Sequence, residues 1–527
     1  MLDSRTQKYD RQLRLWQAHG QAALESSKIC LLNATAVGSE ILKNLILPAI
    51  GSFTVVDDKL VTQTDLGNNF FLLPESVGQS RARVVTDLLK ELNEEVQGEA
   101  IEENPQNLID QSRHFFEQFT LVVASELTEE YTLKLADLCW EFNVPFVTVK
   151  VHGFIAYARI QCREHTVVES HPEQIVDLRL DCPFESLQAF ASSIDFEQLD
   201  SMAYGHIPYV IILLRCLEEW KASHEGHLPL NSTERAAFKD LIRSKQRAGL
   251  AEEQNFEEAL AAAYRAWAPT TIPSSISAIL NDSAADVITP NTPDFWIIAR
   301  AVRDFVAHEG KGHLPLAGTV PDMHADTDSY VKLQTIYKAK AREDAAAVAT
   351  RVKSLVELSK RSNPISTPDI DRFCKNAAHL RLIRYSSIHE EYAHTSPGLK
   401  QLGNWLSDPD DNIVWYVLFR AAERFRAVNG RYPGELSTPT SAKTDIAGLR
   451  ESLNAFLNQS GLETTVVGNE FIEEFTRAGT SSLHSIASLH GGIVAQEIIK
   501  LLTHQYVPLD NTVILNGIKS TTSVYRL

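Results

Sequence analysis

The stretch from Lys28 to Asp57, KICLLNATAVGSEILKNLILPAIGSFTVVD, restricts the possible folds of this chain more than any other. Its first apolar run, KICLLN, is typical of a buried parallel strand, and the apolar residues that follow recur at helical spacing until Pro48 and Gly51. FTVVD then gives a second β-branched run that ends in an acid. The stretch therefore predicts strand, helix and strand, which is the layout of a nucleotide-binding βαβ unit.

The turn between this strand and helix lacks two of the three glycines of a G-x-G-x-x-G phosphate turn. It reads Asn33-Ala-Thr35-Ala-Val-Gly38, and only Gly38 remains, at the position that allows close packing of helix on strand. A Thr35 side chain stands where bare backbone would approach a pyrophosphate. We expect a nucleotide-binding fold with an impaired phosphate site. The alternative is an ordinary Rossmann-like unit without any nucleotide.

The hydrophobic periodicity divides the chain into three segments. Strands and helices alternate through residues 1–164, which predicts an α/β domain with a largely parallel sheet. Residues 165–480 have a helical period, and residues 481–527 return to α/β character. We therefore expect a discontinuous α/β domain, 1–164 with 481–527, that is interrupted by a large, mainly α-helical insert.

A sequence repeat occurs three times within the predicted insert. Each copy is a strongly apolar helix with a central arginine, an aromatic residue five positions later, then a glycine and a proline. The glycine suits a left-handed helix end and the proline prevents continuation, so each copy is a helix with a defined end. We expect the aromatic residues to face a core rather than a ligand. The arginine and aromatic pairs are Arg215 and Trp220, Arg300 and Phe305, and Arg420 and Phe425.

Charge and composition argue against several classes of function. The chain has 50 Lys and Arg against 68 Asp and Glu, a net charge of −18, which disfavours nucleic acid or an anionic membrane as a partner. The most apolar run, Tyr209 to Leu214, ends at Arg215 and is far too short to span a bilayer. The 6 cysteines form no C-x-x-C pair, so we expect reduced thiols and no metal site. A soluble, intracellular protein is expected.

A basic, amphipathic helix, KYDRQLRLWQAHGQAALESSK, precedes the first strand. It carries Lys8, Arg11 and Arg14, and such residues usually lie on a solvated surface. The functional alternative is an arm that delivers an arginine to another site.

Six segments, in order from end to end, carry a family resemblance: KYDRQLRLW, NATAVGSEILKNL, DLGNNFF, IPSSI, LPLAGTVPDM and GGIVAQEIIK. Together they resemble the regulatory, non-catalytic subunits of the heterodimeric enzymes that activate the Nedd/Rub ubiquitin-like modifier. The resemblance implies a ThiF/MoeB-like adenylation domain that is silent here and active in a partner subunit. It also implies that the partner binds ATP and Mg, and that this chain binds no cofactor.

The resemblance also indicates which nucleotide-binding positions have changed. Active members have a glycine-rich turn, an arginine in an N-R-Q-F segment, a lysine at the start of the next helix and an aspartate after the third strand. Asp57 matches the ribose-binding acid and is retained, but one retained ligand does not make a site. The matching positions hold Asn33, Thr35, Gly38, Asn69, Arg81, and Leu127 beside Glu126.

Two further roles follow from the resemblance. Arg11 matches an arginine that reaches across the dimer to the phosphates of the partner's ATP, where a guanidinium stabilises the charge on the departing pyrophosphate. The helix Tyr330 to Asp344 resembles a segment that contacts the active subunit. The glycine pair inside a late helix predicts close helix packing. The expected interface residues are Tyr330, Leu333, Tyr337, Gly491 and Gly492.

The implied function is support of an activating enzyme in the cytoplasm and nucleus. The family's reaction is ATP-dependent adenylation of the modifier's C-terminal glycine, thioester formation on the partner, and transfer to a conjugating enzyme and then to cullins. Cys182, in D-C-P-F, resembles a nucleophile, but only Arg179 lies nearby to lower its pKa and no adjacent histidine could act as its base.

Three alternatives stay open at this point. A self-sufficient adenylating or dinucleotide-dependent enzyme would require the glycine turn that is missing. The small subunit of the Sumo-activating enzyme shares the basic N-terminal segment but lacks so large a helical insert. A pure scaffold would have no role in the chemistry, and loss of Arg11 would then have no effect.

Overall fold

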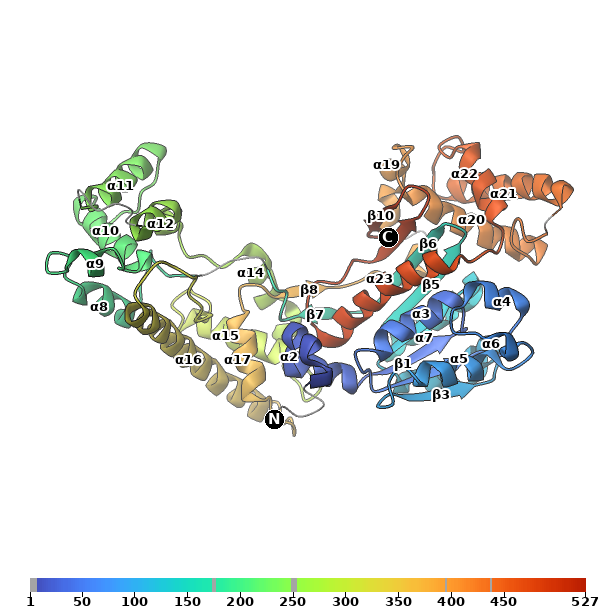
Figure 1. Ribbon diagram of the computed structural model, residues 1–527, viewed down its shortest axis with the longest axis horizontal. Helices are drawn as coiled ribbons and strands as arrows, with labels where there is room; N and C mark the ends of the chain where they lie inside the picture. The colour runs from blue at the N-terminus through green and yellow to red at the C-terminus, as the bar shows by residue number, and fades with distance from the viewer. Residues whose placement is uncertain (1–6, 173–176, 248–253, 394–395, 437) are drawn as a thin grey trace. The chain divides into compact units, whose positions relative to one another are not determined.

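The computed structural model describes residues 7–172, 177–247, 254–393, 396–436 and 438–527. The chain forms two compact units, one made of Met1–His165 and Leu382–Leu527 and the other of Thr166–Arg381. In Figure 1 the blue N-terminal and red C-terminal parts of the ribbon therefore belong to one unit. The α/β domain is discontinuous, as the sequence predicts.

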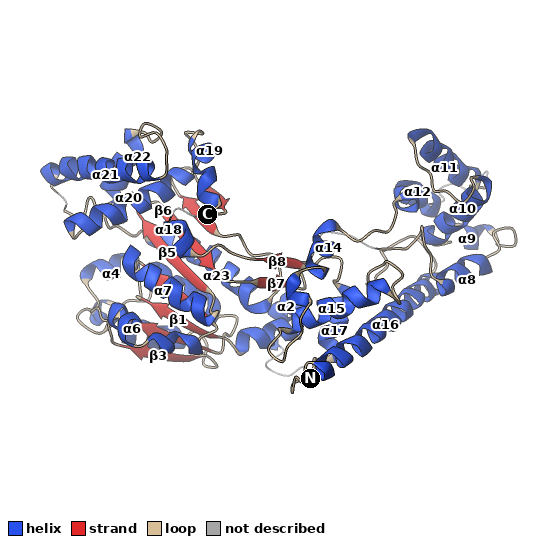
Figure 2. Ribbon diagram, turned by 180° about the vertical axis from the view of Figure 1, so that it is seen from behind, coloured by secondary structure: helices blue, strands red, loops and turns tan. Residues whose placement is uncertain are grey.

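The first unit is organised around an eight-stranded sheet with the order β10-β9-β6-β5-β4-β1-β2-β3, drawn in red in Figure 2. Pairing is parallel from β3 to β5 and antiparallel from β5 to β10. The βαβ unit predicted from KICLLN and FTVVD is confirmed, because β1 and β2 pair in parallel. The strands are β1 (Lys28–Leu32), β2 (Ser52–Val56), β3 (Gln97–Ile101), β4 (Leu121–Ser125), β5 (Phe146–His152), β6 (Ile155–Gln161), β9 (Thr512–Asn516) and β10 (Thr521–Tyr525).

Helices cover both faces of this sheet, which explains why β1 is an uninterrupted apolar run. Ile29 and Leu31 face a core shared with α2, α3, α5 and α23, whereas Cys30 and Leu32 face a core shared with α6 and α7. The helices of the first unit are α2 (Asp10–Glu25), α3 (Ala36–Ile46), α4 (Gln63–Asn68), η1 (Pro74–Ser76), α5 (Arg81–Lys90), α6 (Pro105–Gln111), η2 (Arg113–Gln118), α7 (Glu129–Phe142), α18 (Ile388–Tyr392), η4 (Gly398–Gln401), α19 (Leu402–Leu406), α20 (Ile413–Asn429), α21 (Pro439–Gln459), α22 (Asn469–Ala478) and α23 (His484–Thr503).

The second unit is mainly helical. One apolar core of this unit joins α8, α10, α11, α12 and the first turns of α16. The short strands β7 (His165–Val167) and β8 (Arg381–Ile383) pair where the chain enters and leaves it. The helices are α8 (Glu185–Ser193), α9 (Ser201–Tyr204), α10 (Tyr209–Ser223), α11 (Ser232–Ser244), α12 (Gln254–Ala262), α13 (Tyr264–Trp267), α14 (Ser274–Leu280), η3 (Ser283–Ala285), α15 (Asp294–Ala307), α16 (Thr327–Leu358) and α17 (Thr367–Lys375).

The expected insert, residues 165–480, is divided between the two units rather than forming one body. Helices α18 to α22 belong to the first unit, where Tyr416 and Phe419 of α20 share a core with Tyr157 of β6 and Ile514 of β9. The second boundary therefore lies at 381/382 and not at 480. The third copy of the repeat is an apolar helix like the other two, although it carries more charged residues, and its sequence does not reveal which surface it covers.

The three repeats form α10, α15 and α20. Their aromatic residues Trp220, Phe305 and Phe425 are all buried, which confirms the prediction that they face a core. Only α20 ends directly at a left-handed glycine, Gly430 with φ of 71°. Of the helices within the described ranges, none is both long enough and apolar enough to cross a bilayer.

Candidate functional site

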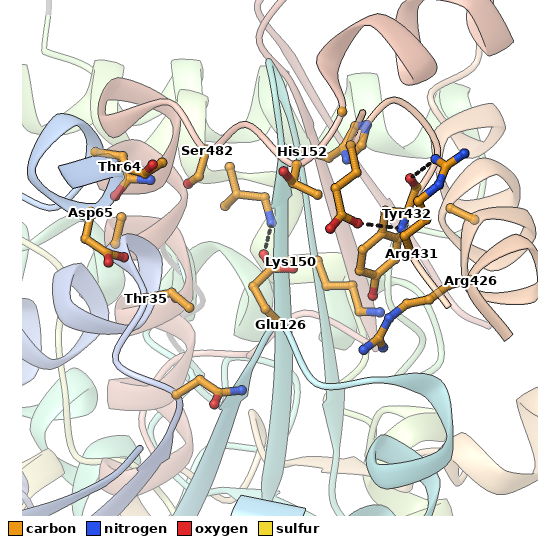
Figure 3. A pocket seen from close by; sticks show the side chains of 18 of the residues that line it. Thr35, Thr64, Asp65, Glu126, Lys150, His152, Arg426, Arg431, Tyr432 and Ser482 are labelled. Carbon is orange, nitrogen blue, oxygen red and sulfur yellow. Dashed lines mark hydrogen bonds between the residues drawn. The ribbon is translucent and has the colours of Figure 1, made fainter. Parts of the chain in front are cut away.

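The candidate site lies at the carboxyl ends of β1, β4 and β5. Strand β1 lies between β2 and β4, and the strand order reverses there, which is where open α/β sheets bind ligands. A cavity of about 740 Å³ opens at this edge. Figure 3 shows Thr35 and Asp65 on one side of it and Arg426 and Arg431 on the other, with Lys150 of β5 between them.

Side chains of the degenerate turn bridge the ends of β1 and β4. Asn33 adopts a left-handed conformation with φ of 66°, and its Nδ2 donates to the Ser125 carbonyl oxygen over 2.8 Å. The Thr35 hydroxyl makes a short hydrogen bond with the Ser125 hydroxyl and also accepts from the Gly38 amide over 3.4 Å, which caps α3. These bonds lie where a glycine-rich turn would expose its backbone to phosphate.

Gly38 has the packing role that the sequence suggests. A Cβ at this position would lie 3.0 Å from Leu31 Cδ1 and 3.1 Å from the Asn33 carbonyl oxygen. The start of α3 therefore lies too close to β1 for any larger residue without displacement of its neighbours.

The retained acid, Asp57, is engaged entirely within the chain. It is completely buried, and its Oδ2 accepts from the Ala34 amide over 2.8 Å and from Arg81 Nε over 2.7 Å. Its Oδ1 accepts from the Lys59 amide over 2.9 Å. Arg81 Nη1 also donates to Asp65 over 3.2 Å. Both groups that could contact a nucleotide therefore stabilise the turn and the start of α5 instead.

The other two changed positions are also structural. Asn69 is buried, donates to Ser39 Oγ over 3.1 Å and accepts from the Phe71 amide over 3.1 Å. Leu127 is buried in the apolar core beside α7. The family resemblance implies that these two positions have lost their nucleotide-binding side chains. In the structure, Asn69 forms hydrogen bonds within the chain and Leu127 packs in a core.

A buried polar network beside the turn was not anticipated from the sequence. Lys150 of β5 pairs with Glu423 of α20 through a short contact, and the Tyr432 hydroxyl donates to the same carboxylate over 2.6 Å. Burial opposes ionisation of Glu423, but the Lys150 ammonium keeps its pKa below the usual value. The sequence does contain one indication of this buried network. The run FVTVKVH places Lys150 and His152 in a strand that is otherwise mostly apolar.

Two further groups that line the same cavity, Glu126 and His152, have pKa values shifted by burial. Burial raises the pKa of Glu126 to about 7, although its Oε1 accepts from the Val151 amide over 2.7 Å. Burial lowers the pKa of His152 to about 4, and its Nε2 lies 2.6 Å from the Phe475 carbonyl oxygen. Near neutral pH, His152 is therefore uncharged and Glu126 is poised between its two forms.

Arg11 differs from the two neighbouring basic residues, Lys8 before α2 and Arg14 within it. Lys8 forms an ion pair with Glu95 at 3.3 Å, and Arg14 forms one with Asp10 at 3.0 Å. Arg11 is exposed, and its guanidinium has no ion-pair or hydrogen-bond partner in the part of the chain that the structure describes. It is therefore available to a group outside the chain.

The expected interface residues need correction. Leu333 and Tyr337 are completely buried in the core of the second unit, and the Tyr337 hydroxyl donates to the Leu178 carbonyl oxygen over 2.7 Å. Gly491 is buried against Glu40 of α3, whose Cβ would lie 2.8 Å from an added Cβ. These three cannot face a partner. Tyr330 is half-buried, and Gly492 has open space where its side chain would be.

Cys182 lies in the second unit and has no features of an activated nucleophile. Its Sγ donates to Asp181 Oδ1 over 3.4 Å. Desolvation, followed by the neighbouring Asp181 charge, raises the pKa of the thiol to about 11. A thiol with such a pKa is protonated at neutral pH and reacts slowly.

Comparison with known proteins defines the class to which this fold and site belong. Residues 9–527 match the model of the ThiF family, and the chain belongs to this family. A NEDD8-activating enzyme E1 regulatory subunit from Xenopus laevis is 44% identical over 527 residues, which covers 99% of this chain and 98% of that protein. The corresponding protein from Danio rerio is 42% identical over 530 residues, 99% of each chain. Within the ThiF family, the chain belongs with these regulatory subunits, as the six segments suggest.

Proposed function

We propose that this chain is the regulatory subunit of a heterodimeric NEDD8-activating enzyme and that it supplies Arg11 to the ATP site of a catalytic partner. The proposal depends chiefly on one contrast. Arg11 is exposed and unpaired among the described residues, whereas Asp57 and Arg81, which match nucleotide ligands, are bonded to each other. Among its described residues, such a chain presents an exposed guanidinium to a partner, while side chains bridge the turn that would otherwise bind phosphate.

The chemistry of adenylation explains why a guanidinium from a second chain is useful. The partner binds ATP and Mg, the modifier's C-terminal carboxylate attacks the α-phosphorus, and pyrophosphate leaves with increased negative charge. Arg11 donates to this leaving group in a bidentate manner without reorganisation of solvent. One such charge-assisted contact contributes about 1.5–3 kcal/mol, or roughly ten- to a hundredfold in rate.

The later steps belong to the partner. The adenylated modifier forms a thioester on a cysteine of the catalytic subunit, then passes to a conjugating enzyme and on to cullins. The raised pKa of Cys182 supports this assignment, since a protonated thiol is a poor nucleophile.

The test is ATP–pyrophosphate exchange by this chain assembled with its catalytic partner, in the presence of the modifier. We expect Arg11→Ala to lower exchange about ten- to a hundredfold. Arg14→Ala is the matched control, because Arg14 is exposed on the same helix but pairs with Asp10. Exchange that is unchanged in Arg11→Ala would favour a pure scaffold.

Nucleotide binding by the isolated chain separates this proposal from a self-sufficient enzyme. We expect no tight ATP or NAD binding, because the phosphate turn is bridged by Asn33 and Thr35. Stoichiometric binding, or formation of a modifier adenylate by this chain alone, would contradict the proposal.

A further inference from the structure

The helix that carries Arg11 is broken. Gln17 has φ of 58° and ψ of −179°, so α2 consists of a segment before Gln17 and a second helical segment after it. We call residues 10–16 the arm. The arm belongs to the first unit and contains Arg11 near its start.

The start of the arm is anchored by a buried tyrosine. Tyr9 is 1% exposed, and its hydroxyl donates to Glu95 Oε2 over 2.7 Å. The same hydroxyl accepts from Asn93 Nδ2 over 3.1 Å, and this amide group also donates to the Ile46 carbonyl oxygen over 3.1 Å. Tyr9 thus connects the arm to the loop before β3 and to the end of α3.

The end of the arm is anchored by a residue from the other end of the chain. Gln505, which follows α23, is 1% exposed, and its Nε2 donates to the Trp16 carbonyl oxygen over 2.8 Å. Trp16 itself is buried in the main core of the unit. The packing is tight here, since a Cβ at Gly20 would lie 2.8 Å from Gln505 Nε2. The break at Gln17 is therefore held in place from both sides.

These two anchors have a consequence for Arg11. The side chain is exposed and has no partner among the described residues, so nothing orders it except the backbone of the arm. A charged group that acts on a transition state is most effective when its position is set before the reaction, because no free energy is then used to order it. An arm without anchors would lose that advantage.

We propose that Tyr9 and Gln505 are positioning residues for Arg11. Their hydrogen bonds fix the two ends of the arm so that the guanidinium is presented to a partner-bound polyphosphate in a set position. This inference rests on the proposed function, because it assigns an action only through Arg11.

The test is a double-mutant cycle between Tyr9 and Arg11 in the assembled heterodimer. Exchange is measured with Tyr9→Phe, Arg11→Ala and the double variant, with rates normalised to the assembled complex recovered by gel filtration. Tyr9→Phe keeps the buried ring and removes only the hydroxyl. We expect Tyr9→Phe to lower the maximal exchange rate about two- to tenfold, which corresponds to the free energy of one hydrogen bond. It should have no further effect once Arg11 is alanine.

Two more comparisons isolate the anchor bonds. Gln505→Met keeps the size of the side chain and removes the Nε2 contacts with the Trp16 carbonyl oxygen and with His19 Nε2, both on α2, so we expect a loss that also disappears without Arg11. Glu95→Gln keeps an acceptor for the Tyr9 hydroxyl and should leave exchange near wild type, whereas Glu95→Ala should resemble Tyr9→Phe. Tyr131→Phe is the matched control, because the Tyr131 hydroxyl donates to Asp110 over 3.1 Å on another pair of helices.

The outcomes separate this inference from the proposed function. If Arg11→Ala lowers exchange but Tyr9→Phe and Gln505→Met do not, the anchors do not position Arg11 and the proposed function stands. If Tyr9→Phe lowers exchange by the same factor with and without Arg11, the tyrosine acts on the fold alone and the inference fails. If Arg11→Ala has no effect, the proposed function fails and the inference fails with it.

Discussion

The ion pair between Asp57 and Arg81 is a stabilising element of the first unit, and its disruption tests our proposal that these two residues serve the fold and not a nucleotide. Asp57 is completely buried, and the Arg81 side chain is 8% exposed. Replacement of Arg81 by methionine keeps the apolar stem and removes the charge. The Asp57 carboxylate then stays buried with only the amides of Ala34 and Lys59 as donors.

Loss of one partner from a buried ion pair typically costs about 3–5 kcal/mol, because the remaining charge is left without compensation. The two amides that still donate to Asp57 place our expectation near the lower limit, about 3 kcal/mol. Asp57→Asn in the Arg81→Met background should recover part of this loss, since it removes the uncompensated charge.

Hydrogen exchange of amides in β1 and β4, followed by mass spectrometry, measures this effect in the first unit alone. A single unfolding transition is not suitable for a chain with two units. Arg83→Met is the matched control, because Arg83 lies on the same helix but pairs with Glu102 on the exposed surface. Such exposed pairs contribute little.

Equal protection in Arg81→Met and Arg83→Met would refute the argument. It would mean that the buried pair adds nothing to stability, and that Asp57 and Arg81 are kept for another purpose such as a ligand.

Two further predictions concern the same unit. Gly491→Ala should destabilise it by about 1–3 kcal/mol through overpacking against Glu40, whereas Gly492→Ala, in open space, should stabilise it by about 0.5–1 kcal/mol; equal changes in the hydrogen-exchange protection of β1 and β4 would contradict this. The raised pKa of Glu126, about 7, means that the folded state retains a proton that the unfolded chain releases near pH 4.5, so this group's contribution to stability falls between pH 4.5 and 7. Glu126→Gln should therefore gain stability relative to wild type from pH 5 to pH 8, by up to about 3 kcal/mol, and opening free energies from hydrogen exchange in the first unit that differ equally at both pH values would contradict this.

The sheet and the changed turn could be predicted from sequence because their signals are local. KICLLN and FTVVD are short apolar runs that become adjacent parallel strands. The missing turn glycines likewise predict that side chains occupy the phosphate position. In the structure, Thr35 and Asn33 of this turn bond to Ser125. Periodicity alone could not reveal this partner, since Ser125 comes from a strand far along the chain.

The errors have a common physical origin, since each concerns which surface an element covers. The 3.6-residue period identifies α20 as an apolar helix but not that it packs on β6 and β9, so the boundary at residue 480 was misplaced. The family resemblance identified the helix that contains Leu333 and Tyr337. It did not show that these two side chains lie on the buried face of that helix. The pair between Lys150 and Glu423 joins residues far apart in sequence, and no local pattern connects them.

The bonding of the turn explains why glycines alone would not restore a nucleotide site here. Glycine at positions 33 and 35 would remove both bridges to Ser125 and reopen the backbone to phosphate. Asp57 would still be completely buried and would still accept from Arg81 and from the Ala34 and Lys59 amides, so a ribose hydroxyl would meet a carboxylate whose two oxygens already have donors within the chain. We therefore expect the bonds of Asn33 and Thr35 and the bonds of Asp57 each to oppose nucleotide binding, so that reversal of one set leaves the other in place. Arg11 takes part in neither set of bonds among the described residues, so the action that we propose for it on another chain would not disturb them.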